Sequence, residues 1–147
     1  MPTVMSQDGT PIAYARAGVG PALILVVGAF NDQMTGVPLA QALQDRYTVY
    51  TYDRRGRGQS SDRSPYAVER EIEDLDALIN VAGGSAHVFG YSSGAVLALR
   101  AAAQGLAIEG LVLYDPPPTG PRARDLAAQL AGLIGDGRRG EAVELFQ

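Results

Sequence analysis

Residues 86–103, AHVFGYSSGAVLALRAAA, decide how this chain of 147 residues folds. A short apolar run (Ala86–Phe89) leads into Gly90-Tyr91-Ser92-Ser93-Gly94, and an alanine-rich segment typical of a helix follows directly. The sequence therefore predicts a strand, a tight turn and a helix in succession. Glycine is needed at both ends of the turn because a Cβ there would collide with the neighbouring strand or helix.

A turn this tight forces Ser92 into an unfavourable backbone conformation and exposes its hydroxyl at the carboxyl edge of a sheet. The start of the helix places the backbone N–H of Ser93 beside that hydroxyl, where it can donate to a developing oxyanion. We therefore expect Ser92 to be a nucleophile and Ser93 an oxyanion donor. The alternative is an ordinary glycine-rich turn between a strand and a helix, which any α/β protein can contain.

Strand-like runs alternate with helical patterns along the chain, as in βαβ units on a parallel sheet. The expected strands are 4–6, 12–16, 22–27, 47–52, 86–89 and 111–114. The expected helices are 36–43, a segment that begins at Ser64-Pro65 and ends before Gly83, 94–103, 125–134 and 139–146. The pattern predicts an α/β fold with a doubly wound sheet that is mostly parallel after an antiparallel start.

The helix expected after Ser64-Pro65 contains five acidic residues. They are Glu69, Glu71, Glu73, Asp74 and Asp76. Because they are spread around the helix, we interpret them as a solvated face opposite an apolar stripe and not as a metal site.

Composition excludes several classes of protein. The net charge of −4, with arginine as the only basic residue besides His87, argues against a nucleic-acid partner. The chain has no cysteine and a single histidine, so we expect no metal and no cofactor. The longest apolar stretch (21–30) is about half the ~20 residues of a membrane helix, and no signal peptide is visible. We therefore expect a cytoplasmic protein without a membrane partner.

The segment 53–62, DRRGRGQSSD, invites two functional interpretations. A phosphate- or RNA-binding patch is disfavoured by its acidic surroundings. A dinucleotide fingerprint fails because Ser61 stands where the third glycine belongs and no helix opens on the glycines. We favour a structural loop held by hydrogen bonds of Asp53 and the arginine side chains.

Three motifs together resemble the α/β-hydrolase fold family, of the esterase or haloperoxidase-like type. They are Asp8-Gly9-Thr10, the segment 52–60 that resembles the family's D-x-R-G-x-G-x-S loop, and the Gly90–Gly94 nucleophile elbow. The resemblance implies a sheet of strand order 1-2-4-3-5-6. It further implies a core over residues 1–115, truncated before the family's last strands, and the beginning of a helical cap or lid over residues 116–147.

The resemblance also implies roles for residues around Ser92. The loop Val27-Gly28-Ala29-Phe30 matches the family's second oxyanion segment, with Ala29 as the donor. Phe30 and Tyr91 would line the substrate pocket, although ordinary packing explains them equally well. Asp115 lies where some members carry the acid of the triad, but an aspartate that simply starts a turn is the alternative.

The general base of a Ser–Asp–His triad is missing from this chain. No histidine follows Ser92, and His87 lies five residues earlier, about 16 Å along an extended strand. We expect a truncated serine hydrolase for ester-like or small acyl substrates, or else a shortened homologue. The alternative is a non-catalytic module that binds a small molecule or a partner, and an unpaired sheet edge would allow association.

Overall fold

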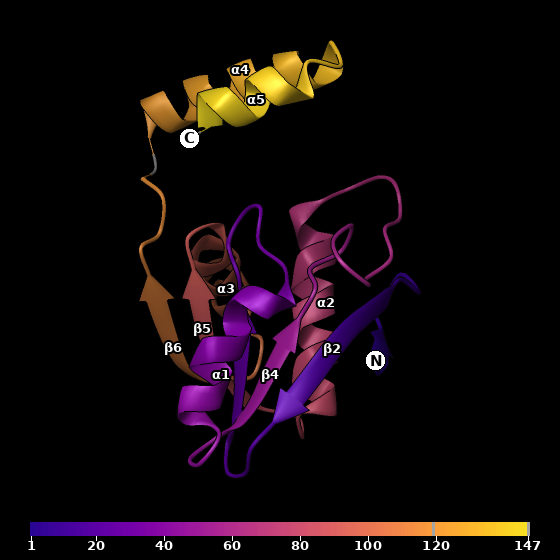
Figure 1. Ribbon diagram of the computed structural model, residues 1–147, viewed down its shortest axis with the longest axis vertical. Helices are drawn as coiled ribbons and strands as arrows, with labels where there is room; N and C mark the ends of the chain where they lie inside the picture. The colour runs from indigo at the N-terminus through magenta and orange to yellow at the C-terminus, as the bar shows by residue number, and fades with distance from the viewer. Residues whose placement is uncertain (119, 147) are drawn as a thin grey trace. The chain divides into compact units, whose positions relative to one another are not determined.

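The computed structural model describes residues 1–118 and 120–146, and the chain divides into two compact units, Met1–Pro116 and Pro117–Gln147. Thr119 and Gln147, both in the segment expected to begin a cap, lie outside the described residues. The first unit contains a six-stranded sheet (Figure 1). The second contains the helices α4 (Pro121–Gly135) and α5 (Arg139–Phe146), and their role as a cap stays a prediction.

The order of the elements in the first unit follows the alternation of patterns in the sequence. The elements are β1 (Thr3–Met5), β2 (Pro11–Ala17), β3 (Ala22–Val26), η1 (Gln33–Gly36), α1 (Val37–Leu43), β4 (Thr48–Tyr52), α2 (Val68–Val81), β5 (Ala86–Tyr91), α3 (Ser93–Ala103) and β6 (Ile108–Tyr114). The sheet order β1-β2-β4-β3-β5-β6 confirms the predicted one. Pairing is antiparallel from β1 to β4 and parallel from β4 to β6, which confirms the predicted fold class.

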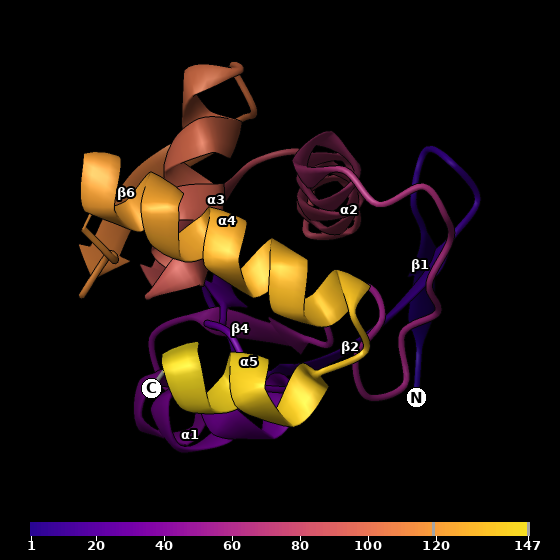
Figure 2. The ribbon, with the colours of Figure 1, turned by 90° about the horizontal axis from the view of Figure 1, so that it is seen from above.

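The side chains of β3 alternate between the two faces of the sheet, and each face has its own core. Ile24 and Val26 belong to the core that α2 and α3 cover, whereas Leu23 and Leu25 pack toward α1. Figure 2 shows α2 and α3 on one side of the sheet and α1 on the other. Each buried aliphatic side chain contributes about 1.5–3 kcal/mol, so these two cores hold the strand ends in register.

Many boundaries differ from the sequence-based expectation by one or two residues, and the starts of α2, β6 and α4 differ by more; α4 begins at Pro121 and not at 125. Helix α2 begins at Val68 and not at Ser64-Pro65, because Ala67 has an extended backbone (φ −148°, ψ 151°) and acts as the residue before the helix. Strand β6 begins at Ile108 and not at 111, since its pairing with β5 extends across Gly110. Every helix in the described part of the chain is too short or too polar to cross a bilayer.

The parallel strands β4, β3, β5 and β6 all end at the same edge of the sheet. The loops that leave this edge carry the residues singled out by the sequence, among them 28–31, 53–62, Ser92 and Asp115. Among the described strands β6 is an outer one, and association through that edge stays a prediction. The topology thus places the residues of the candidate site at the carboxyl edge of the sheet.

Substitution Gly94→Ala tests whether the close approach of α3 to β3 holds the first unit together. A Cβ at Gly94 would lie 2.1 Å from the carbonyl oxygen of Val26, so the substitution forces helix and strand apart. We expect the free energy of unfolding, measured by urea denaturation with circular dichroism, to fall by about 3 kcal/mol or more. Gly132→Ala in α4, with nothing within 4 Å of the added Cβ, is the matched control and leaves that transition unchanged. Equal behaviour of the two variants would contradict the prediction.

Candidate active site

The turn between β5 and α3 has the strained backbone that the sequence predicts. Ser92 adopts φ 54° and ψ −121°, a conformation that residues with a side chain rarely adopt. A Cβ at Gly90 would lie 2.6 Å from the Cα of Ala95, and one at Gly94 would meet β3. Both glycines are therefore required by close packing, and they fix Ser92 at the tip of the turn.

Backbone from two other strands surrounds Ser92. A Cβ built on Gly28 would lie 3.0 Å from the Cβ of Ser92, so the loop after β3 passes directly beside this serine. The amide of Ser92 donates to the carbonyl oxygen of Tyr114 over 2.9 Å, which ties the turn to the end of β6. Ser92 is half-buried, and its Oγ makes no hydrogen bond within the described residues. The hydroxyl is thus available to a ligand at this edge.

The two amides predicted as oxyanion donors belong to Ser93 and Ala29. Ser93 is the first residue of α3, so its N–H has no acceptor within the helix. On the opposite side is the turn of residues 28–31, in which the side-chain amide of Asn31 donates to the carbonyl oxygen of Ala29 over 2.6 Å. Phe30 in this turn has φ 57°. The two predicted donors, Ala29 and Ser93, therefore belong to the two segments that adjoin Ser92.

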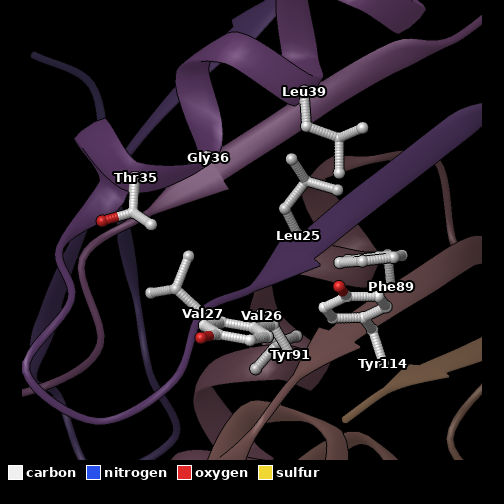
Figure 3. A pocket seen from close by; sticks show the side chains of 9 residues that line it. All are labelled: Leu25, Val26, Val27, Thr35, Gly36, Leu39, Phe89, Tyr91 and Tyr114. Atoms are coloured by element: carbon white, nitrogen blue, oxygen red, sulfur yellow. The ribbon is translucent and has the colours of Figure 1, made fainter.

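Two cavities open at this edge of the sheet. An apolar one of about 220 Å³ is lined by aromatic and aliphatic side chains, with the ring centroids of Tyr91 and Tyr114 5.8 Å apart (Figure 3). A second, of about 430 Å³, is lined by residues 29–32 and Arg57. Of these two cavities in the described part of the chain, Phe30 lines the second and Tyr91 the first. Their role in binding substrate stays a prediction.

The two remaining titratable candidates lie at opposite ends of their strands. Asp115 follows Tyr114, whose carbonyl oxygen accepts the amide of Ser92, and it has φ 49°. His87 lies near the start of β5, with its Nε2 3.7 Å from a carboxylate oxygen of Glu109 and its ring 6.0 Å from that of Tyr47. Asp115 is thus next to the candidate nucleophile in the sheet, whereas His87 is engaged elsewhere.

The loop of residues 53–62 is a structural loop, as the sequence predicts. The buried carboxylate of Asp53 accepts the amides of Gln33 and Gln59, each over 2.9 Å. A Cβ at Gly58 would lie 2.2 Å from the same carboxylate, which explains the glycine there. Asp53 therefore fixes the loop against η1.

The arginines of this loop reveal an error in the sequence-based interpretation of α2. Glu71 and Asp74 are buried and do not belong to a solvated face. Arg54 forms two hydrogen bonds with Glu71 (2.6 and 2.7 Å), and Arg55 forms two with Asp74 (2.8 and 2.7 Å). Helical periodicity cannot detect such pairs, because each partner lies on a different element. No group of three or more metal-binding side chains occurs among the described residues.

These pairs alter the protonation of several groups. Burial alone would raise the pKa of Glu71, but the hydrogen bonds and charge of Arg54 lower it below its usual value. The hydrogen bond from Arg55 holds the pKa of Asp8 well below its usual range. Burial and the hydrogen bond to Glu71 raise the pKa of Tyr66 to about 12. All three groups therefore keep one protonation state around neutral pH.

Two arginines of the loop also contact the segments beside Ser92, which sequence reasoning missed. Nη1 of Arg54 donates to the Oγ of Ser93 (3.1 Å) and to the carbonyl oxygen of Val27 (3.2 Å). Nη1 of Arg57 donates to the carbonyl oxygens of Gly28 (2.6 Å) and Asn31 (3.2 Å). The only signal in the sequence was the density of arginine in a loop at the carboxyl edge of the sheet.

Comparison with known proteins agrees with this geometry. The model of the alpha/beta hydrolase family matches residues 23–146, most of the chain. This chain therefore belongs to the alpha/beta hydrolase family. The structure of an alpha/beta hydrolase from Sphaerobacter thermophilus is similar to it with a TM-score of 0.90 and 52% identity, covering 99% of this chain and 58% of that one.

Two curated relatives are enzymes. N-formylmaleamate deformylase of Pseudomonas putida is 38% identical over 135 residues, 88% of this chain and 50% of the relative. The pimeloyl-[acyl-carrier protein] methyl ester esterase of Xylella fastidiosa is 30% identical over 109 residues, 74% of this chain and 41% of the relative. The chain thus spans about half or less of the length of these relatives, which are hydrolases.

Substitution Glu71→Gln tests the buried pair with Arg54. At pH 7 it leaves a buried guanidinium without its counter-charge, and we expect a loss of about 3–5 kcal/mol of unfolding free energy. Because the pKa of Glu71 is lowered in the folded state, its contribution is complete above the unfolded value of about 4.3 and is lost as the pH falls below it.

The difference between wild type and Glu71→Gln therefore narrows toward pH 3, as urea denaturation at several pH values would measure. The control is Glu73→Gln, which removes the more exposed pair with Arg70 and costs less than about 1 kcal/mol. A difference that stays constant from pH 7 to pH 3 would contradict the prediction.

Proposed function

We propose that this chain is the N-terminal portion of a serine hydrolase that acts on ester-like or related small acyl substrates. The observation that carries the proposal is the left-handed backbone of Ser92, at the tip of a turn that two close-packed glycines enforce. Such strain is retained where it serves a site. The unpartnered hydroxyl beside the backbone of Gly28 supports the same conclusion.

In the proposed reaction the Oγ of Ser92 attacks the carbonyl carbon of the substrate. The carbonyl π bond opens, and the resulting oxyanion accepts hydrogen bonds from the amides of Ala29 and Ser93. Collapse of this intermediate expels the leaving group and forms an acyl-enzyme, which water hydrolyses. The names of two relatives, a deformylase and a methyl ester esterase, support acyl cleavage as the class of reaction.

The proton of Ser92 needs an acceptor, because a serine hydroxyl is a weak nucleophile at neutral pH. His87 is at the other end of β5 beside Glu109, so we assign this role to an imidazole from the part of the relatives that this chain does not span. We assign Asp115 as the acid that orients it, since Asp115 directly follows the residue bonded to the amide of Ser92.

A fluorophosphonate probe tests the nucleophile. Ser92 Oγ attacks phosphorus and displaces fluoride, and imidazole added to the solution takes the proton in place of the missing base. We expect mass spectrometry to find the adduct on Ser92, with Ser92→Ala unlabelled and Ser85→Ala, the control at a distant serine, labelled like wild type.

Among the described residues His87, the one imidazole, lies at the other end of β5 from Ser92, which favours one other function, a site that binds a small ligand without catalysis. Folded wild-type protein that stays unlabelled with and without imidazole would overturn the hydrolase and support this binding role.

Asp115→Asn tests the proposed acid. If Asp115 orients an imidazole toward Ser92, the substitution lowers the imidazole-dependent labelling rate by about tenfold or more while leaving the slow imidazole-independent rate unchanged. Asp45→Asn, at an exposed position after α1, is the control with unchanged rates. An unaltered imidazole-dependent rate in Asp115→Asn would mean that Asp115 only starts the turn before the prolines.

A further inference from the structure

The turn of residues 28–31 borders an open space and is connected to its surroundings by hydrogen bonds. The side chain of Phe30 is 66% exposed, and Asp32 beyond it is exposed as well. A cavity of about 430 Å³ is lined by residues 29–32 together with Arg57. The positive φ of Phe30 adds strain to the turn. Such a segment keeps its shape only where specific contacts fix it.

Arg57 supplies two of those contacts. A single nitrogen, Nη1, donates to the carbonyl oxygens of Gly28 and Asn31, which flank Ala29 and Phe30. No carboxylate within the described residues lies within 4.0 Å of this guanidinium. Arg57 therefore differs from Arg54 and Arg55, whose charges are paired with α2. Its side chain is committed to the backbone of one turn.

The surroundings of Arg57 disfavour the charged form of its guanidinium. Burial lowers the pKa of Arg57, and the neighbouring charge of Arg54 lowers it further. A half-buried guanidinium with no described carboxylate within 4.0 Å is stabilised mainly by its hydrogen bonds to the two carbonyl groups. The two hydrogen bonds to the carbonyl groups of Gly28 and Asn31 thus fix the position of the Arg57 side chain.

We propose that Arg57 is a positioning residue of the candidate site: by holding the carbonyl groups on both sides of Ala29 and Phe30, it keeps the Ala29 amide directed at the space in front of Ser92. This inference rests on the proposed function of Ala29 as an oxyanion donor. Arg57 acts through the backbone and does not touch the reacting atoms. Loss of the Arg57 side chain destabilises the charged tetrahedral intermediate more than it weakens substrate binding. The reason is that the Ala29 amide donates to the oxyanion only when negative charge develops there.

Backbone ¹⁵N relaxation measured by NMR tests the structural half of the proposal without any chemistry at Ser92. In Arg57→Gln we expect the order parameters of the Ala29 and Phe30 amides to fall from the rigid range of about 0.85 to below about 0.6, because the turn loses two of its hydrogen bonds. Arg57→Lys keeps a charged donor group for the two carbonyl groups and stays in the rigid range. The matched control is Arg63→Gln, which removes an exposed arginine just after the loop of residues 53–62 that donates to the carbonyl oxygen of Asp8. Unchanged order parameters in Arg57→Gln would overturn the proposal.

Phosphonylation kinetics of Ser92 in imidazole test the functional half. We expect Arg57→Gln to lower the maximal labelling rate by about 10- to 100-fold, with the probe concentration at half-maximal rate nearly unchanged. A merely structural role would lower the unfolding free energy and leave the maximal rate of the folded protein unchanged, which would overturn the proposal even if the order parameters fall. If wild type itself is not labelled, the proposed function fails, whereas the relaxation experiment still decides whether Arg57 holds the turn.

Discussion

The close approach of α3 to β3 is the constraint on which the rest of the first unit depends. Gly94 lies so near the carbonyl oxygen of Val26 that no side chain fits between them, and a Cβ on Gly90 would lie 2.6 Å from the Cα of Ala95. With both contacts in place the chain has room for only one path from β5 into α3. That path gives Ser92 its positive φ and brings its hydroxyl beside the loop after β3.

A second layer of constraints comes from the loop after β4. Its arginines connect elements that the sheet alone does not join: Arg54 links α2 to the start of α3, and Arg57 fixes the turn after β3. Buried ion pairs contribute little net stability compared with apolar packing, but a missing partner is costly, so they select one arrangement over its alternatives. At this edge of the sheet the arrangement selected is the one that brings the loop after β3 and the start of α3 beside Ser92.

The sequence allowed the fold and the strained serine to be predicted because both depend on local patterns. The run Ala86–Phe89, the two glycines and the helix after them are contiguous, and the strand order followed from the resemblance to a family. The pairing of Glu71 with Arg54 could not be predicted from periodicity, since 17 positions separate the partners and the contact exists only after the sheet has formed. For the same reason the two carbonyl groups bound by Arg57 carried no sequence signal.

The position of β3 in the sheet has a consequence for how the chain emerges from the ribosome. This strand is synthesised before both of its neighbours in the sheet, β4 and β5. Its apolar residues can pair with these strands only after about 25 and 65 further residues have been added to the chain. The backbone packing around Ser92 requires both Val26 and Gly94, so it forms only after β5 and the start of α3 have been synthesised. During synthesis the apolar residues of β3 are therefore left without their sheet neighbours until β4, and then β5, have emerged.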